Sequence, residues 1–427
     1  MAKNILPPSW SDLDSHEIRL LLKERIGGHG QYDTEITGST VIHIPAAREQ
    51  CKLSLKYRDG RITTISTGPA FDKAEWQQIV AEVDTTFRNG TDVSMRAIAF
   101  SSFRVPGAWR STRSGIRILP APESAPDTEL EIAEHPFVLE YTYKSVASQA
   151  VSQYRATIAL QRVTLLLNVL LIGRTCLQPA ATSASWAMRW ENDAPRFEWL
   201  QQSYFASLAE YPATLSVLES HAQLTEVPDS AYYGVIGHDG KGLRVPESLD
   251  DSLARFFALD ASSAERITRA LYWFDVAQRT YSLSTSVSFA ALVSSIEALT
   301  DRGNAHTIAC PECGQTMTHE TPGATKRFQE VVERHAGGAS TKNSRDLIYR
   351  LRSNVLHGSA LMQVDQLKYV GWDPPEWNEF TIHRHLWDLT SRVVRGWLAE
   401  IGGTRPPNPN TVHLDRFRRR LVNTCTR

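Results

Sequence analysis

The chain has 427 residues, of which 42% are apolar and 22% charged, values typical of a folded protein rather than a disordered one. Its 46 lysines and arginines nearly balance its 47 aspartates and glutamates, so the net charge identifies no partner and any nucleic-acid surface has to be local. This length exceeds one ordinary hydrophobic core and predicts two or three domains.

The compartment is predicted from what the sequence lacks. The N-terminus has no apolar run followed by small residues, and no segment offers about 18 uninterrupted apolar residues for a membrane span. Five scattered cysteines without a regular framework are typical of a reducing compartment. We therefore expect a cytoplasmic protein that has no membrane partner.

Residues 1–250 predict a mixed α+β region that divides near residue 145. Its clearest predicted elements are a hairpin over Cys51–Ser66 that turns at Asp59-Gly60, a helix over 72–87, a half-buried strand over 137–143, and a helix over 148–172 that ends at Gly173. Four aromatic residues either cover a core or offer a stacking surface to a ligand: Trp186, Trp190, Phe197 and Trp199. We expect this region to sense a signal or to regulate the rest of the chain.

Residues 251–403 predict an all-α bundle. Apolar residues recur at helical spacing over 264–277, 287–299, 328–335, 345–358 and 382–397. Five amphipathic helices within about 140 residues make a helical bundle the economical arrangement. The predicted fold class is therefore α+β, with an all-α C-terminal part and a basic tail over 404–427.

The segment Arg345–Gly358 places catalytic residue types on one of these helices. Gly358 is suited to end the helix, so Arg352, Ser353, Asn354 and His357 gather at its C-terminal end. A guanidinium can stabilise a crowded phosphate, and an imidazole can move protons near neutral pH. Together they suit phosphodiester cleavage.

Two motifs together resemble a known family. The helix that reads Ser-Phe-Ala-Ala-Leu-Val-Ser-Ser-Ile-Glu-Ala-Leu-Thr (288–300) is followed about fifty residues later by Leu-Arg-Ser-Asn-Val-Leu-His-Gly (351–358). An Ile-Glu-Ala-Leu helix followed by Arg, four residues and His-Gly is similar to the HEPN superfamily, and the Apea-like HEPN branch most closely. The resemblance covers about residues 260–400.

This resemblance implies a helical bundle that acts as a metal-independent endoribonuclease in antiphage defence or a stress response. It implies catalytic roles for Arg352 and His357, with Ser353 and Asn354 in support. The family often has Asn, Asp or His directly after the arginine, whereas this chain has Ser353 there and Asn354 one place later.

The chemistry also constrains the arrangement. The 2′-hydroxyl of RNA is an internal nucleophile, so cleavage leaves a 2′,3′-cyclic phosphate and needs only proton transfer and charge stabilisation. Five residues along a helix rotate a side chain by about 500°, which leaves Arg352 and His357 about 140° apart. The resemblance implies that dimerisation brings two copies of the motif together, and we predict a homodimer.

A structural interpretation competes with the catalytic one. Arg352 could simply pair with a carboxylate such as Glu297, and His357 could cap the helix end, where the helix dipole favours a cation. In the catalytic interpretation Glu297 instead orients Arg352. The rival function is an inactive module for dimerisation or RNA binding, joined to an N-terminal region that senses a ligand or a phage protein.

An insert and the tail carry two further predictions. Cys310-Pro-Glu-Cys313-Gly resembles a zinc knuckle, and His306 and His319 flank it as the remaining ligands of a structural zinc site; a redox pair or two ordinary thiols are the alternatives. No metal is needed for catalysis. The basic tail could bind RNA phosphates or dock as a helix, and its candidate RNA-binding residues are Arg416, Arg418, Arg419 and Arg420.

Overall fold

The computed structural model shows an α+β protein whose chain divides into two compact units, residues 1–95 with 141–161, and residues 96–140 with 162–427. The structure describes residues 7, 10, 13–26, 31–34, 40–45, 52–58, 60–67, 73–121, 135–173, 175–177, 184–201, 221–234, 242–300, 306–309, 316–319, 323–366 and 377–401. Among these residues, no helix combines the length and the apolar character that a membrane crossing requires. The division expected at residue 250 falls inside the second unit.

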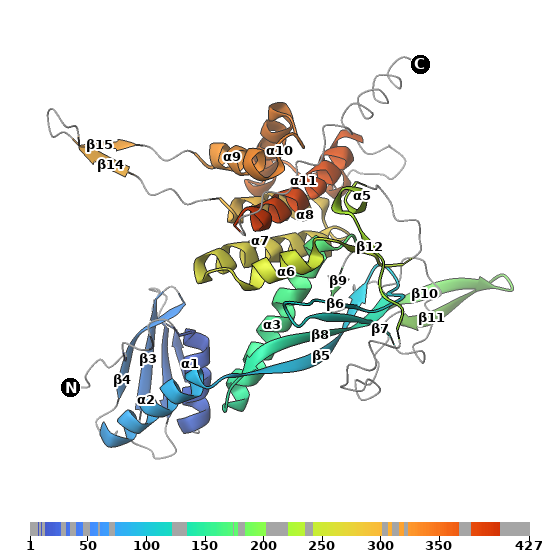
Figure 1. Ribbon diagram of the computed structural model, residues 1–427. Helices are drawn as coiled ribbons and strands as arrows, with labels where there is room; N and C mark the ends of the chain where they lie inside the picture. Colours follow the sequence, from blue (N-terminus) through green and yellow to red (C-terminus); the bar gives the residue numbers. More distant parts are fainter. Residues whose placement is uncertain are drawn as a thin grey trace, which may run out of the picture. The chain divides into compact units, whose positions relative to one another are not determined.

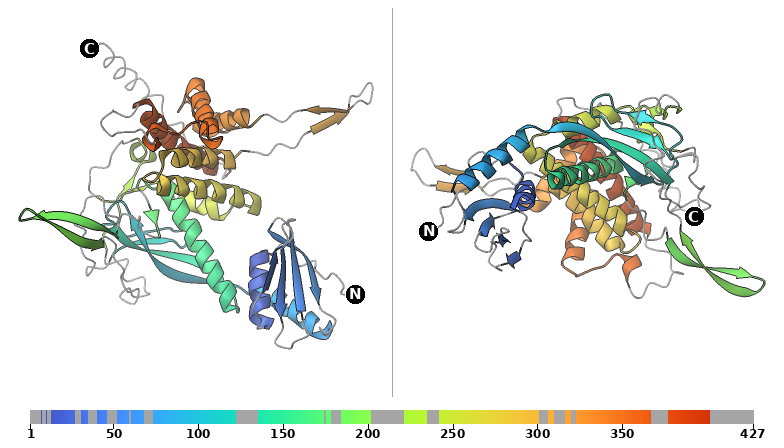
Figure 2. Two further views of the ribbon diagram at one scale, coloured as in Figure 1. Left: turned by 180° about the vertical axis from the view of Figure 1, so that it is seen from behind. Right: turned by 90° about the horizontal axis from the view of Figure 1, so that it is seen from below.

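The first unit is a four-stranded antiparallel sheet packed against two helices (Figures 1 and 2). Its elements are α1 Ser15–Ile26, β1 Gln31–Thr34, β2 Thr40–Pro45, β3 Lys52–Arg58, β4 Arg61–Thr67 and α2 Lys73–Arg88. The expected hairpin is confirmed by β3 and β4, which turn at Gly60 with φ of +77°. One core joins helices and sheet, and it contains Ile18, Leu22, Leu53, Leu55, Ile65, Trp76, Ile79 and Val83.

Most residues of a five-stranded sheet belong to the second unit. The strands lie in the order β6-β7-β8-β5-β9. Their bounds are β5 Thr91–Ser101, β6 Trp109–Arg110, β7 Arg117–Pro120, β8 His135–Ser145 and β9 Thr175–Cys176. The long helix expected after the sheet is confirmed by α3, Gln149–Leu170, and Gly173 has the positive φ of +108° that suits a residue just past a helix end.

The expectation that only one face of β8 is buried was wrong. Val138, on the face expected to be exposed, is buried in a cluster with Ala108 and Leu119. Glu140 is buried on that face too, and the reason is electrostatic: its carboxylate binds Arg96 and Arg117 at 3.0 and 2.9 Å. A buried ion-pair network can cover a strand face that an apolar alternation marks as open to solvent.

Short elements connect the sheet to the bundle. They are β10 Ala184–Glu191, β11 Ala194–Gln201, β12 Glu226–Val227, α5 Asp229–Tyr232 and β13 Val245–Pro246. β10 and β11 form a hairpin that turns at Asn192 and Asp193, both with positive φ, and Trp186 lies directly opposite Trp199 in its register. The side chains of the four aromatic residues lie outside the described part of the chain.

The helical part expected from residue 251 is confirmed (Figure 1). Its helices are α6 Leu249–Phe257, α7 Ala261–Thr280, α8 Thr285–Ala298, α9 Ala324–Ala336, α10 Lys342–Leu356 and α11 Trp377–Ile401, with a 3₁₀ turn over Gln363–Asp365. The insert between α8 and α9 forms two paired strands, β14 His306–Ala309 and β15 Thr316–His319. Two of the helices come close enough to require a glycine, because a Cβ on Gly396 of α11 would lie 2.2 Å from the carbonyl oxygen of His335 in α9.

Burial differs sharply between the two helices that carry the predicted motif. α8 packs against α7, α9, α10 and α11, and nine of its side chains are buried, including Phe289, Leu292 and Ile296. In α10, by contrast, only Ile348 is fully buried. α8 is therefore the centre of the bundle, and α10 is a more exposed helix laid against it.

Candidate functional site

The four polar residues predicted as a site lie at the end of α10. The helix begins after Thr341, whose hydroxyl accepts a hydrogen bond from the Ser344 amide, and it ends at Leu356. His357 is its last capping residue, and Gly358 has φ of +71°, as expected for a glycine that ends a helix. The local geometry predicted for this segment is thus confirmed.

Arg352 is fixed by an ion pair with Glu297 of α8. Its terminal nitrogen Nη2 donates to Glu297 Oε2 at 2.7 Å, and each side chain is 22% exposed. At this depth water screens the pair only in part. The pair joins the two motifs, which lie far apart in the sequence, into one cluster.

Tyr349 completes this cluster. Its hydroxyl donates to Glu297 Oε1 at 3.1 Å, and its ring lies 5.7 Å from the Arg352 guanidinium carbon. Burial, and after it the Glu297 carboxylate, raises the pKa of Tyr349, so the phenol stays protonated and keeps donating. Both oxygens of Glu297 are therefore occupied by groups from α10.

The guanidinium of Arg352 retains donor capacity. Its side chain is 22% exposed, and the bond to Glu297 is made by Nη2. An arginine presents five N–H donors in a rigid fork, and the bond to Glu297 uses only part of that fork. The side chain is thus oriented by one carboxylate while it can still bind a phosphate oxygen.

His357 lies apart from this cluster. Its backbone amide donates to the Ser353 carbonyl at 3.0 Å, and its side chain is exposed. Among the described contacts, no hydrogen bond or ion pair joins His357 to Arg352. Within one chain, the arginine is anchored against α8 and the imidazole faces solvent, as the rotation along the helix predicted.

Two of the four residues between Arg352 and His357, the polar residues Ser353 and Asn354, form hydrogen bonds through their backbones. The carbonyl of Ser353 accepts from His357, and the carbonyl of Asn354 accepts from the Ser359 amide at 2.9 Å and from its hydroxyl at 3.1 Å. These bonds satisfy carbonyls that a helix end otherwise leaves open. These hydrogen bonds fix the position of the His357 backbone at the end of α10.

The other predicted site residues are placed only in part. His306 and His319 are direct partners in the register of β14 and β15, while Cys310 and Cys313 lie outside the described residues. The tail arginines at 416, 418, 419 and 420 also lie outside the described residues.

Sequence reasoning missed Tyr349. A usable signal was present, because Tyr349 and Arg352 are three residues apart and residues at that spacing share a helix face. Comparisons of the whole chain with protein-family models, with characterised proteins and with solved structures found no match.

Proposed function

We propose that the chain is a metal-independent endoribonuclease of the HEPN type, with Arg352 and His357 as its catalytic residues. The observation that carries the proposal is the anchored guanidinium of Arg352, which Glu297 orients through Nη2 while the side chain stays 22% exposed. A partly exposed guanidinium whose direction is fixed by a carboxylate can bind a phosphate without reorganising.

Each residue has a defined role in the proposed reaction. The imidazole of His357 takes the proton from the 2′-hydroxyl or gives one to the leaving 5′-oxygen. Arg352 binds two oxygens of the phosphate and stabilises the charge that develops on it. The products are a 2′,3′-cyclic phosphate and a 5′-hydroxyl, and Glu297 acts as a positioning residue through Arg352.

We further propose that the site is completed by a second copy of the chain. An apolar patch on the bundle surface supports this, formed by Leu283, Val287, Leu361 and Val364, of which Leu283 is 81% exposed. Asp365 holds its two segments together, because its carboxylate accepts a hydrogen bond from the Ser284 hydroxyl at 2.8 Å. One of the residues of the patch, Leu361, lies four residues after His357 in the sequence. Exposed apolar surface of this kind is typical of protein interfaces.

Two observations favour a second candidate function. Arg352 is already paired with Glu297, and no described contact joins it to His357. Those two facts also fit an inactive module that dimerises or holds RNA. In that case the N-terminal region would carry the recognition of a ligand or a phage protein.

Three parts of the proposal rest on the sequence and the family resemblance. They are a setting in antiphage defence or stress response, a structural zinc held by the insert, and RNA contacts from the tail. Metal analysis of the purified protein tests the zinc: we expect one zinc per chain, lost in the double variant Cys310→Ser with Cys313→Ser. A chain purified without zinc, whose thermal stability a chelator leaves unchanged, would contradict the site.

The reaction class is tested with two matched oligonucleotides in the presence of a metal chelator. One is RNA, and the other has the same sequence with a 2′-O-methyl group on every ribose. We expect the RNA to be cut to fragments that end in 2′,3′-cyclic phosphate and the methylated strand to stay intact. Cleavage of both strands, or of neither, contradicts the proposal.

A further inference from the structure

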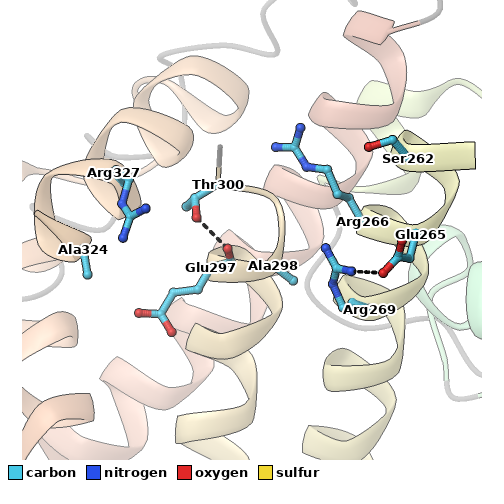
Figure 3. A pocket seen from close by; sticks show the side chains of 9 residues that line it. All are labelled: Ser262, Glu265, Arg266, Arg269, Glu297, Ala298, Thr300, Ala324 and Arg327. Carbon is cyan, nitrogen blue, oxygen red and sulfur yellow. Dashed lines mark hydrogen bonds and ion pairs between the residues drawn. The ribbon is translucent and has the colours of Figure 1, made fainter. Parts of the chain in front are cut away.

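A cavity of about 550 Å³ lies beside Glu297 (Figure 3). It is bounded by α7, by the C-terminal end of α8 and by the first turn of α9. Its volume falls within the range of small-ligand sites and leaves more room than one inorganic ion needs. Eight of its nine lining residues lie on these helices, and the ninth, Thr300, follows the end of α8.

The cavity is lined by more cations than anions. Arg266 and Arg269 reach it from α7, and Arg327 reaches it from α9 on the opposite side of the α8 end (Figure 3). The two carboxylates in the lining are already engaged, because Glu265 pairs with Arg269 and Glu297 is bound by groups from α10. The remaining field in the cavity is therefore positive.

Arg327 has a guanidinium that is available to a ligand. Its side chain lines the cavity and is only partly buried. Among the described residues, none forms a hydrogen bond or an ion pair with this side chain. Arg266, in contrast, is fixed in place, since its Nη2 binds the Leu299 carbonyl and its guanidinium stacks on the Trp397 ring.

The helix ends around the cavity also favour an anion. Ala324 lines it from the first turn of α9, a 13-residue helix whose N-cap Gly323 supplies no side-chain acceptor, so the first amides of that helix stay open. At the C-terminal end of α8, two carbonyls that would repel an anion accept hydrogen bonds. The Thr300 hydroxyl donates to the Glu297 carbonyl at 2.7 Å, and Arg266 donates to the Leu299 carbonyl.

We propose that this cavity is a phosphate-binding site. The phosphate comes either from a nucleotide or from the backbone of a bound RNA strand, and the recognising chemistry is the same: guanidinium donors, backbone amides and no open carboxylate. Glu297 lines the cavity and also binds Arg352, so one carboxylate connects the cavity to the proposed catalytic arginine. Binding does not depend on cleavage.

The test compares Arg327→Gln with Lys326→Gln in the full chain. Both remove one positive charge from the same turn of α9, but Lys326 is exposed and does not line the cavity. A His357→Ala background keeps RNA probes intact. One arm measures thermal stabilisation by inorganic phosphate and by adenosine monophosphate, and the other measures binding of a fluorescent single-stranded RNA in a chelator at several salt concentrations.

We expect Arg327→Gln to weaken binding about tenfold, as loss of one charge-assisted contact does, and to reduce the salt slope by about one contact. Loss confined to the small-phosphate arm identifies a nucleotide site, and loss in the RNA arm identifies a backbone phosphate; both support the proposal. Equal binding by the two variants in both arms overturns it. Circular dichroism checks the fold, and Ser262→Glu, which adds a carboxylate at an exposed lining position, should weaken binding as well.

This outcome is separable from that of the proposed nuclease. If the chain binds phosphate through Arg327 but cuts no RNA, the phosphate site is supported and the nuclease proposal is rejected. If the chain cuts RNA but Arg327→Gln binds phosphate as well as Lys326→Gln does, the nuclease proposal is supported and the phosphate site is rejected.

Discussion

Glu297 Oε2 lies 2.7 Å from Arg352 Nη2, and this bond ties the Ile-Glu-Ala-Leu helix to the helix that carries Arg, four residues and His. The pair is 55 residues apart in the sequence and partly buried. Its energetic coupling can be measured by a double-mutant cycle with Glu297→Ala, Arg352→Ala and the double variant. We expect a coupling of about 1 to 3 kcal/mol in the unfolding of the bundle, because each single variant strands its partner. If the losses of unfolding free energy in the two single variants simply add up in the double variant, the ion pair does not contribute to stability.

Tyr349 supplies the second bond to Glu297. Tyr349→Phe removes only the hydroxyl, and we expect it to cost about 1 kcal/mol of unfolding free energy, the value of one hydrogen bond. Because Tyr349 contacts Glu297 and not the substrate, RNA cleavage should fall much less than in Arg352→Ala. Chemical denaturation and initial cleavage rates measure the two effects. A loss of cleavage as large as that of Arg352→Ala would make Tyr349 itself catalytic.

Much of this site could be predicted from the sequence because its signals are local. The end of α10 is determined by Gly358, and the buried stripe of α8 by the spacing of apolar residues. Hydrogen bonds between residues far apart in the sequence could not be predicted in this way. Asp365 caps the start of α8 from 79 to 81 residues away, and no local pattern marks a carboxylate that will fold back onto a helix N-terminus.

The burial of individual charged side chains could not be predicted from the sequence either. Glu140 reads as the polar position of an alternating strand, but it is buried because two arginines from neighbouring strands reach it. Arg327 lies on an amphipathic helix, and its Nε is buried although the residue is charged. Side chains whose surroundings are set by distant elements are those that a single sequence leaves undetermined.

His383 makes the stability of the bundle depend on pH. The ring is buried in α11 beside Ser288, and Nε2 is the donor of their 3.0 Å bond because the Ser288 hydroxyl itself donates to the Ala277 carbonyl. Burial lowers the pKa of His383 to about 4 from 6.5. Since the unfolded chain binds a proton below pH 6.5 and the folded chain does not, stability falls as pH drops from 6.5 towards 4.

We expect this histidine to remove about 2 kcal/mol of stability between pH 7 and pH 5. Urea denaturation at the two pH values measures it, and His383→Gln, which keeps a neutral donor, is the comparison. The variant should lose clearly less stability over this interval than the wild type. An equal loss in both proteins would assign the pH dependence to other groups.

The apolar patch makes a prediction about assembly. Leu283→Glu and Val364→Glu each place a charge where the proposed dimer buries apolar surface, so both should convert a dimer into a monomer. Phe257→Glu is the matched control, since Phe257 is an exposed apolar residue on α6, outside the patch. Light scattering after gel filtration gives the mass. A wild type that stays monomeric at all concentrations would refute the two-copy site.

The proposed cleavage of RNA by Arg352 and His357 is tested most directly by the initial rate of RNA cleavage in a chelator. The proteins compared are wild type, Arg352→Ala, His357→Ala and Arg350→Ala. Arg350 is exposed on the same helix and controls for the loss of one arginine. We expect the first two variants to be slower by at least about a hundredfold, as the loss of acid–base or charge stabilisation predicts, and Arg350→Ala to match wild type. Rates for Arg352→Ala and His357→Ala equal to that of the control would contradict the account.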